Sequence, residues 1–309
     1  MTILASAIDL VGETPLLRLS RAYPGPGQIV AKAEFLQPGG SVKDRAAKGI
    51  LLAALADGRL RPRMPVVEMT SGNMGAGLAV VCAALGHPLI VTMSSGNSPA
   101  RAKMLEGLGA EVVLVPQVDG EPGRVTGADI AAASDRARRI SDERSGFYVD
   151  QFNASEGILA HASTTGPEIW RQSDGTVDAW VATIGTAATF LGVAQYLRSV
   201  KPDVVCAAVE PESSRPLAGQ AIVDPRHLLQ GTGYGLVPPH WDPALADVFL
   251  SVTDEQAQYW RQRLATTEGL YVGYSAAANV AASAQLLASG SLPKQAIAAT
   301  VLCDTGLKY

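Results

Sequence analysis

Residues 64–86 read MPVVEMTSGNMGAGLAVVCAALG, and two different periodicities meet in this one stretch. MPVVEM is a short β-branched run typical of a buried strand, whereas AGLAVVCAALG is alanine-rich and long enough for a helix. Between them TSGNMG, residues 70–75, has the small and polar residues of a tight connection. The stretch therefore predicts a strand that leads directly into a helix, which is the repeating unit of α/β proteins.

The same alternation extends along the chain. Further short apolar runs read as strands, and helical patterns separate most of them. These runs are QIVAKAE, PLIVTM, AEVVLVP, DAWVATI, DVVCAAVE, VFLSV and AIAATVLC. With 309 residues, of which 47% are hydrophobic, the chain can bury a large core and is expected to divide into two lobes. The prediction is a two-lobed α/β protein with mainly parallel, twisted sheets and helices on both faces.

Composition and charge argue against several classes of function. The formal net charge of −4 predicts no basic surface for nucleic acid or an anionic membrane. Neither an export signal nor a membrane-spanning stretch is found. The cysteines, Cys82, Cys206 and Cys303, are widely separated in apolar surroundings, which favours reduced thiols and a cytoplasmic protein. The histidines lack ligand spacing, so no metal site is expected.

The segment GGSVKDR, residues 39–45, raises the question of why an ammonium group stands at a helix start. Ser41 is a good N-cap, Asp44 suits the first turn, and apolar residues at helical spacing continue to a stop at Gly58. The helix dipole disfavours a positive charge at Lys43. One interpretation is an ordinary solvated lysine. The other is an amine that ionises less readily in an electropositive niche and condenses with a carbonyl group.

Two further junctions share the chemistry of TSGNMG. GTAAT, residues 185–189, follows DAWVATI and opens a helix, and GYSAAANV, residues 273–280, presents Ser275 at another helix start. Small residues let backbone N–H groups face a ligand, and a helix start favours anions. Each junction alone also fits an ordinary tight turn. Together they suit pyridoxal phosphate: a carbonyl for the lysine, a phosphate for one loop and a substrate carboxylate for the other.

With these motifs in order, the sequence resembles the cysteine synthase (O-acetylserine sulfhydrylase) and cystathionine β-synthase family, pyridoxal-phosphate enzymes of fold type II with the tryptophan synthase β fold. The resemblance covers nearly the whole chain. It runs through GETPLLRL, PGGSVKDR, VEMTSGNMGAGLA, GAEVVLVP, DQF, TTGPEIW, VATIGTAAT, QGTGYGLVP and DTGLKY. It implies a smaller, mobile substrate-gating domain of residues 39–149 and a larger cofactor-binding domain of residues 1–38 and 150–309. A homodimer is expected with it.

The resemblance also implies roles for the motif residues. Lys43 would be the catalytic residue, forming the Schiff base with pyridoxal 5'-phosphate and later moving the α-proton. Asn73 would bind the cofactor's 3-oxygen, and Ser275 would be the partner of the pyridine nitrogen. The phosphate loop would consist of Gly185, Thr186, Ala187, Ala188 and Thr189. The substrate side of the site would consist of Thr70, Ser71, Asn73, Met74 and Gln151.

The reaction implied by the resemblance is a β-replacement catalysed by a transferase. An O-activated L-serine would lose its leaving group to give an aminoacrylate intermediate, and a sulfur nucleophile would add to it, giving L-cysteine or an S-substituted cysteine. A weakly acidic serine at the pyridine nitrogen favours elimination over transamination. An amine nucleophile and a serine/threonine ammonia-lyase stay open as alternatives. The intact Lys43, Asn73 and Ser275 count against a non-catalytic binding protein.

Several residues depart from the family's usual pattern. Met74 replaces a threonine, and its side chain either faces the pocket or turns into the helix packing. Ala187 and Ala188 replace a pair of glycines, which is tolerable only if these residues do not need a positive φ. Gln37 and the segment MSSGNSP, residues 93–99, also differ. The departures predict a side branch of the family with a specialised donor or nucleophile.

Overall fold

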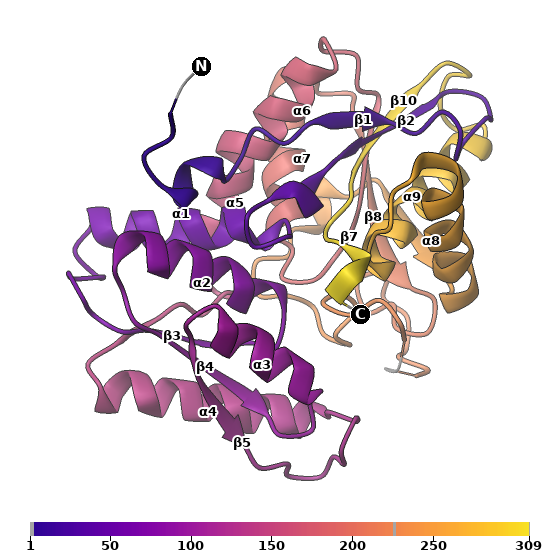
Figure 1. Cartoon of the computed structure of the whole chain (residues 1–309). Helices are drawn as coiled ribbons and strands as arrows, with labels where there is room; N and C mark the ends of the chain where they lie inside the picture. The colour runs from indigo at the N-terminus through magenta and orange to yellow at the C-terminus, as the bar shows by residue number, and fades with distance from the viewer. Residues whose placement is uncertain (1–2, 225–226, 309) are drawn as a thin grey trace. The chain divides into compact units, whose positions relative to one another are not determined.

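The chain folds as two α/β units (Figure 1). A computed structural model describes residues 3–224 and 227–308. The first unit comprises the chain up to Val11 together with Gln37–Gly157, and the second comprises Gly12–Leu36 and the chain from Ile158 onward. Each unit has its own sheet, and the predicted α/β class is confirmed.

Among the described residues, the sheet of the second unit has six strands in the order β1-β2-β10-β7-β8-β9. The strands are β1 (Leu16–Arg18), β2 (Gln28–Lys32), β7 (Ala179–Thr183), β8 (Val205–Pro211), β9 (Val248–Val252) and β10 (Ile297–Val301). β1 pairs antiparallel with β2, and the other pairings are parallel. Every residue of the central strand β7 is buried, because both faces of the sheet are covered.

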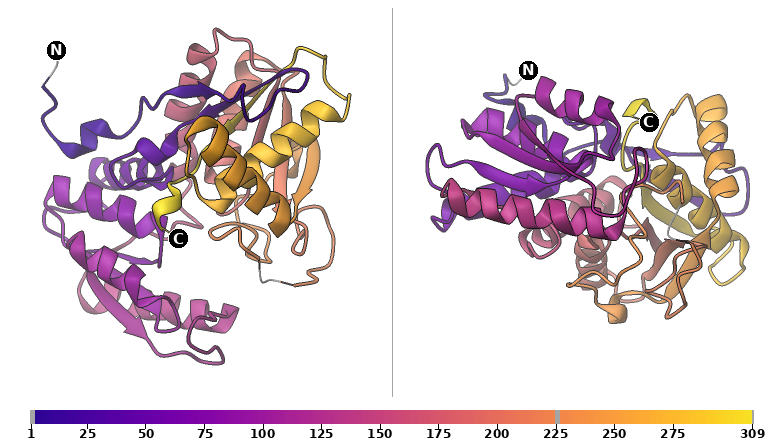
Figure 2. Two further views of the ribbon diagram at one scale, coloured as in Figure 1. Left: turned by 45° about the vertical axis from the view of Figure 1, so that its right-hand side comes forward. Right: turned by 90° about the horizontal axis from the view of Figure 1, so that it is seen from below.

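Helices cover the two faces of this sheet (Figures 1 and 2). On one face, Ala179 and Val181 of β7 share an apolar core with α8 (Asp254–Glu268) and α9 (Tyr274–Ala288). On the other, buried Trp180 donates through Nε1 to the carbonyl of Phe190 at 3.2 Å. Side chains alternate along a strand, so β7 contributes to both layers. The other helices of this unit are η2 (Glu34–Leu36), η3 (His161–Thr165), α6 (Gly166–Gln172), α7 (Ala188–Val200), η4 (Pro243–Leu245) and η5 (Gly306–Lys308).

In the first unit, the described strands form a parallel sheet in the order β5-β4-β3-β6. They are β3 (Val66–Met69), β4 (Leu89–Ser94), β5 (Glu111–Val115) and β6 (Phe147–Tyr148). Val66 and Val91 pack with α1 (Lys43–Ala56) and α2 (Asn73–Leu85), and the opposite face is covered by α4 (Gly127–Glu143). The unit also contains η1 (Ala7–Leu10) and α3 (Pro99–Gly107), and α5 (Glu156–Ala160) contains the point where the chain passes into the second unit.

Each predicted strand is present, and the two that were not predicted are short. β1 has 3 residues and β6 has 2, which is too few for a periodicity to be visible in the sequence. The first long helix begins at Lys43, one residue later than a Ser41 N-cap predicts, and Val42 before it makes no side-chain cap. Ser41 Oγ accepts a hydrogen bond from the N–H of Lys43 at 3.3 Å instead. Gly58 follows the helix in the left-handed conformation, with φ +81°.

Candidate active site

Lys43 is the first residue of α1 and is half-buried. The loop before it is held in place by Asp44, a buried carboxylate that accepts a hydrogen bond from the N–H of Gly39 at 2.5 Å. Buried Ser41 adds the contact to the Lys43 N–H. Lys43 is therefore attached at the N-terminal end of a helix, where the helix dipole disfavours a positive charge.

The TSGNMG connection leads from β3 into α2. Thr70 is buried, and its Oγ1 accepts a hydrogen bond from the N–H of Gly72 at 3.3 Å. Asn73 is the first residue of α2. Ser71 Oγ accepts a hydrogen bond from Nη1 of Arg101 in α3 at 3.2 Å. Arg101, which the sequence analysis did not single out, thus brings a positive charge to a loop predicted to bind a carboxylate.

Gly77 brings the starts of α1 and α2 close together. A Cβ atom at this position would lie 3.1 Å from the Cα and N of Asp44 and from the carbonyl carbon of Lys43. Glycine therefore allows α2 to approach the first turn of α1 more closely than a larger residue would. In the sequence this glycine belongs to SGNMGAG, and its role is to set the spacing between Lys43 and the TSGN loop.

Met74 is part of the apolar core of the first unit. Its side chain belongs to the same core cluster as Leu78 and Leu105, and it is 2% exposed. Packing within α2 and against its neighbours therefore accounts for the position of this methionine. Contact with a substrate, the other interpretation of the sequence, stays a prediction.

Gln151 lies just after β6 and contacts an acidic residue on the neighbouring strand β3. Its Nε2 donates to Oε1 of Glu68 at 3.3 Å, and Glu68 is 1% exposed. Burial raises the pKa of Glu68 to about 8, while the hydrogen bond from Gln151 acts in the opposite direction. At pH 7 this carboxyl group is therefore mostly neutral. Glu68 was not among the residues predicted from the sequence, although an acid inside an apolar strand was a visible signal.

In the second unit, the GTAAT loop leads from β7 into α7. Ala187 is the N-cap of α7 and has a φ of +68°, in the left-handed region that costs a non-glycine residue about 1–2 kcal/mol. Ala188, in contrast, is already helical. Alanine was expected to be tolerated in this loop only where no positive φ is needed. Ala188 meets this condition, and Ala187 does not. Strained backbone of this kind is concentrated at ligand-binding sites.

The GTAAT loop lies against the QGTGYG segment, residues 230–235. A Cβ atom at Gly185 would be only 2.3 Å from the carbonyl oxygen of Gly231, so this position requires glycine. Ser275, buried in the first turn of α9, donates through Oγ to the carbonyl of Gln230 at 3.2 Å. The second unit therefore brings the loop predicted to bind phosphate close to the segment that Ser275 contacts.

A buried histidine also contacts the GTAAT loop. His161 Nε2 lies 3.2 Å from Oγ1 of Thr189, and its Nδ1 lies 2.8 Å from Oγ1 of Thr165. A Cβ at Gly192 would lie 2.7 Å from the Cβ of His161, so this glycine permits the close packing. His161 begins η3, a π-helical turn, which is a rare structure often found at functional sites. In the sequence, His161 was noted only as one of the histidines without metal-ligand spacing. Its separation of four residues from Thr165 was the available signal for this contact.

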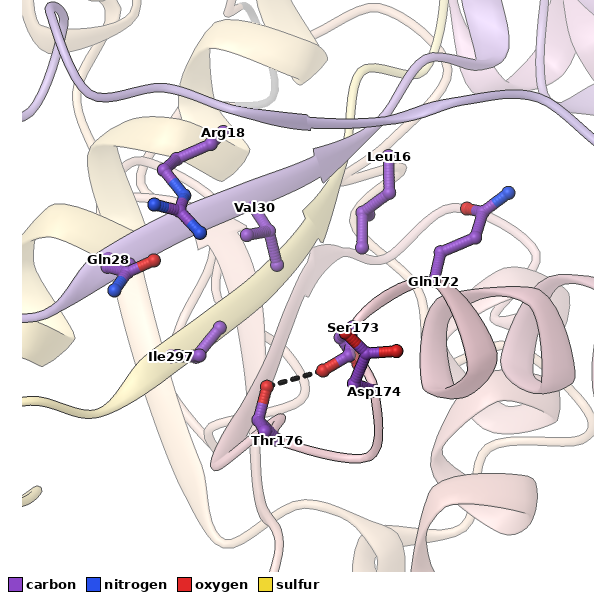
Figure 3. Close-up of a pocket in the computed structure, with 9 residues that line it drawn as sticks. All are labelled: Leu16, Arg18, Gln28, Val30, Gln172, Ser173, Asp174, Thr176 and Ile297. Carbon is purple, nitrogen blue, oxygen red and sulfur yellow. Dashed lines mark hydrogen bonds between the residues drawn. The ribbon is translucent and has the colours of Figure 1, made fainter.

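A pocket of about 220 Å³ lies elsewhere in the second unit (Figure 3). It is lined by Leu16, Arg18, Gln28, Val30, Gln172, Ser173, Asp174, Thr176 and Ile297. Gln28 and Ile297 begin their strands, so the pocket lies at the amino-terminal edge of the sheet. Ligands of parallel α/β sheets bind at the carboxyl edge, where the GTAAT loop follows β7. This pocket is therefore not the candidate active site.

Other features of the described residues bear on function. In residues 3–224 and 227–308, no helix is long and apolar enough to cross a membrane. The same ranges contain no group of three or more His, Cys, Asp or Glu arranged to hold a metal ion. The cysteines form no disulfide, and burial raises the thiol pKa of Cys82 to about 12 and that of Cys206 to about 11. Cys303 is only partly buried.

The fold defines a class of enzyme, together with two groups of residues: Lys43 and the TSGN loop in the first unit, and the GTAAT loop and Ser275 in the second. Residues 8–304 match the family described as "Pyridoxal-phosphate dependent enzyme", and the chain belongs to that family. It is similar to cysteine synthase A of Escherichia coli (strain K12), with 37% identity over 305 residues, covering 97% of this chain and 91% of that protein. The protein is thus a pyridoxal-phosphate-dependent enzyme of the cysteine synthase type, with the architecture of fold type II.

Solved structures extend the comparison. O-ureido-L-serine synthase is 33% identical in sequence, with a TM-score of 0.90, and the match covers 100% of this chain and 94% of that one. Cysteine synthase (OASS) from Entamoeba histolytica is 29% identical, with a TM-score of 0.91 and coverage of 100% and 89%. The solved relatives therefore include enzymes named for different products.

The residues of this chain fit the cofactor of the family. Pyridoxal phosphate needs an amine for its aldehyde, and Lys43 at the start of α1 would supply one. It needs backbone donors for its phosphate, and the GTAAT loop places small residues at the start of α7. It needs a partner for its ring nitrogen, and Ser275 has a buried hydroxyl group at the start of α9.

Proposed function

We propose that the protein catalyses a β-replacement on an O-activated L-serine such as O-acetyl-L-serine. Sulfide or another small sulfur nucleophile forms the new bond at Cβ, and the acyloxy group leaves as acetate. The product is L-cysteine or an S-substituted cysteine. The observation that carries the proposal is the packing at Gly77, which brings Lys43 and the TSGN loop together in one unit. Membership of the family and the likeness to cysteine synthases support it.

The residues of the first unit would handle the amino acid. The bound cofactor would draw electrons from Cα, which makes the α-proton acidic and allows the β-substituent to leave. Lys43 would hold the cofactor and, once the amino acid takes its place, accept the α-proton. The hydroxyl groups of Thr70 and Ser71 and the amide of Gln151 would bind the substrate carboxylate. Asn73, at the start of α2, would contact the 3-oxygen of the cofactor.

The residues of the second unit would hold the cofactor. The loop of residues 185–189 would bind the phosphate through backbone N–H groups at the start of α7. Ser275 would exchange the carbonyl of Gln230 for the ring nitrogen of the cofactor. Because its hydroxyl group is a weak acid, Ser275 would give the ring nitrogen little positive charge, which favours β-elimination over transamination.

The central assignment is tested by locating the cofactor on the protein. The purified enzyme should be yellow, and borohydride reduction followed by peptide mapping should find the pyridoxyl group on Lys43. Lys43→Ala should lose turnover. The matched control is Lys48→Ala, because Lys48 lies on the same helix and its Nζ donates to the carbonyls of Ile8 and Val11. A pyridoxyl group on another lysine, or equal losses in both variants, would contradict the assignment.

A non-sulfur nucleophile is the second candidate, favoured by the likeness to O-ureido-L-serine synthase. A matrix of donors and nucleophiles separates the two candidates: acetyl- and phosphoserine as donors, with sulfide, thiosulfate, homocysteine and amines as nucleophiles. Highest kcat/KM with sulfide or thiosulfate supports the sulfur reaction. Highest kcat/KM with an amine supports the alternative. Stoichiometric pyruvate and ammonia from serine, without added nucleophile, would instead indicate an ammonia-lyase.

Assembly and location are also proposed. A homodimer is supported by exposed apolar side chains in the first unit, including Leu4, Leu10 and Leu108. Light scattering at the mass of one 32.1 kDa chain would contradict it. A cytoplasmic location is supported by cysteines that form no disulfide, and cell fractionation tests it. That residues 39–149 form a mobile, substrate-gating domain is a further proposal, tested by proteolysis with and without amino acid.

A further inference from the structure

Glu68 is a buried acid, and its side-chain hydrogen-bond partner in the described part of the chain is the uncharged amide of Gln151. Glu68 lies two residues after Val66 on β3, so its side chain leaves the strand on the same face, toward the core shared with α1 and α2. Its exposed fraction is 1%. An ionised carboxylate at such a position would lose its hydration without full compensation, so the neutral form is favoured.

The contacts of Glu68 are asymmetric. Oε1 accepts the hydrogen bond from Gln151 Nε2 at 3.3 Å, whereas Oε2 is buried and has no hydrogen bond of normal geometry among the residues that the structure describes. The backbone N–H groups of Asp150 and Gln151 also act on the carboxyl group and oppose the rise of its pKa, but burial outweighs them. The charged and titratable groups that act on it are Asp150 and Tyr148, and the guanidinium of Arg138 lies over the Tyr148 ring at 5.6 Å. The neighbouring Asp150 carboxylate adds a further reason for Glu68 to keep its proton.

The neutral state matters for an anion near Gln151. A glutamine amide has two N–H donors. One is engaged by Glu68, and the same contact fixes the rotation of the amide, so the second can be directed at a carboxylate. A neutral Glu68 exerts no net charge repulsion on that carboxylate, whereas an ionised one would repel it.

We propose that Glu68 is a positioning residue, which orients the amide of Gln151 for capture of the carboxylate of the amino-acid substrate. The inference deepens the proposed function and rests on it. Glu68 does not touch the reacting atoms. It acts through Gln151, so its effect belongs to amino-acid binding and not to the chemical step.

Two variants of Glu68 and one control test this role. Glu68→Leu removes the acceptor, and it should weaken binding of the amino acid about 5- to 20-fold. Glu68→Gln keeps a neutral acceptor and should restore binding. Thr92→Val is the control, because buried Thr92 bonds through Oγ1 to the carbonyl of Ala133 on the opposite face of the same sheet. Binding is measured on the holoenzyme by calorimetry with L-serine and with L-serine methyl ester, and KM and kcat for O-acetyl-L-serine are measured alongside.

The expected pattern is specific to carboxylate capture. Glu68→Leu should weaken L-serine binding and raise KM, while binding of the methyl ester, kcat and the cofactor absorbance stay near the wild-type values. Above pH 8 the wild-type KM should rise more steeply than that of Glu68→Gln. The proposal would be overturned if Glu68→Leu weakened the binding of L-serine and of L-serine methyl ester equally. It would also be overturned if Glu68→Gln and Glu68→Leu had equal effects. A colourless wild-type protein without β-replacement activity would instead overturn the proposed function, so the two failures are distinguishable.

Discussion

His161 Nε2 lies 3.2 Å from Oγ1 of Thr189, so a buried histidine of η3 contacts the last residue of the GTAAT loop. The other ring nitrogen contacts Thr165 at 2.8 Å. Both nitrogens are thus engaged, which fixes the ring plane, and the hydroxyl group of Thr189 gains a defined partner. The contact therefore stabilises the loop that we propose binds the cofactor's phosphate, even before any ligand binds.

Replacing His161 should therefore weaken the binding of the cofactor. We expect His161→Leu to lower the affinity for pyridoxal phosphate about 5- to 10-fold, the value of roughly one hydrogen bond. Titration of the apoprotein followed by absorbance measures it. His87→Leu is the control, since His87 is also buried but bonds to the carbonyl of Met64 in the first unit. Unchanged affinity in His161→Leu would mean that the contact only packs η3 against α7.

The strained residue of the GTAAT loop allows a test of stability. Ala187→Gly should raise the free energy of unfolding by up to about 1 kcal/mol, because relief of the left-handed strain exceeds the added freedom of glycine in the unfolded chain. Ala188→Gly, at the first helical residue, should instead lower it by about 0.5–1 kcal/mol. Denaturant titration compares the two. If both glycine variants lose stability, Ala187 does not carry the strain that its φ of +68° implies.

Met74 in the core leads to a prediction about stability and specificity together. Met74→Thr should lower the free energy of unfolding by about 1–3 kcal/mol, because it leaves a smaller side chain and buries a hydroxyl group. Met74→Leu conserves volume and should cost less than about 1.5 kcal/mol. Thermal unfolding and the donor-by-nucleophile matrix are measured on both variants. A changed substrate preference in Met74→Thr without loss of stability would place this residue at the pocket.

The raised pKa of Glu68 makes stability depend on pH. Its pKa is about 8 in the folded chain against the ordinary 4.5. The stabilising contribution of its bound proton is therefore full below about pH 4.5 and is lost as the pH rises to about 8. Glu68→Gln removes this dependence, and near pH 8 it should be more stable than the wild type by about 1–3 kcal/mol. Denaturant titrations at pH 5, 7 and 8 measure the difference, and a constant difference across this range would contradict the buried neutral state.

The sequence by itself determined the α/β class, the long strands, the helix starts near Lys43 and Ser275, and the connection that contains Asn73. These features follow from local physics: apolar periodicity distinguishes strand from helix, and small or polar residues mark the connections. Each predicted strand is present because its preference is expressed within a few consecutive residues. β1 and β6, with 3 and 2 residues, exist only because neighbouring strands pair with them.

The tertiary structure alone decided which side chains meet. Glu68 and Gln151 are 83 positions apart, and they come into contact because β3 and β6 are paired in the sheet. His161 and Thr189 are brought together by the packing of η3 on α7, which Gly192 permits. The positive φ of Ala187 arises in the same way, from the loop around it and against the preference of alanine. Local pattern places a residue on an element, and only the packing of distant elements sets its partner, its ionisation and its strain.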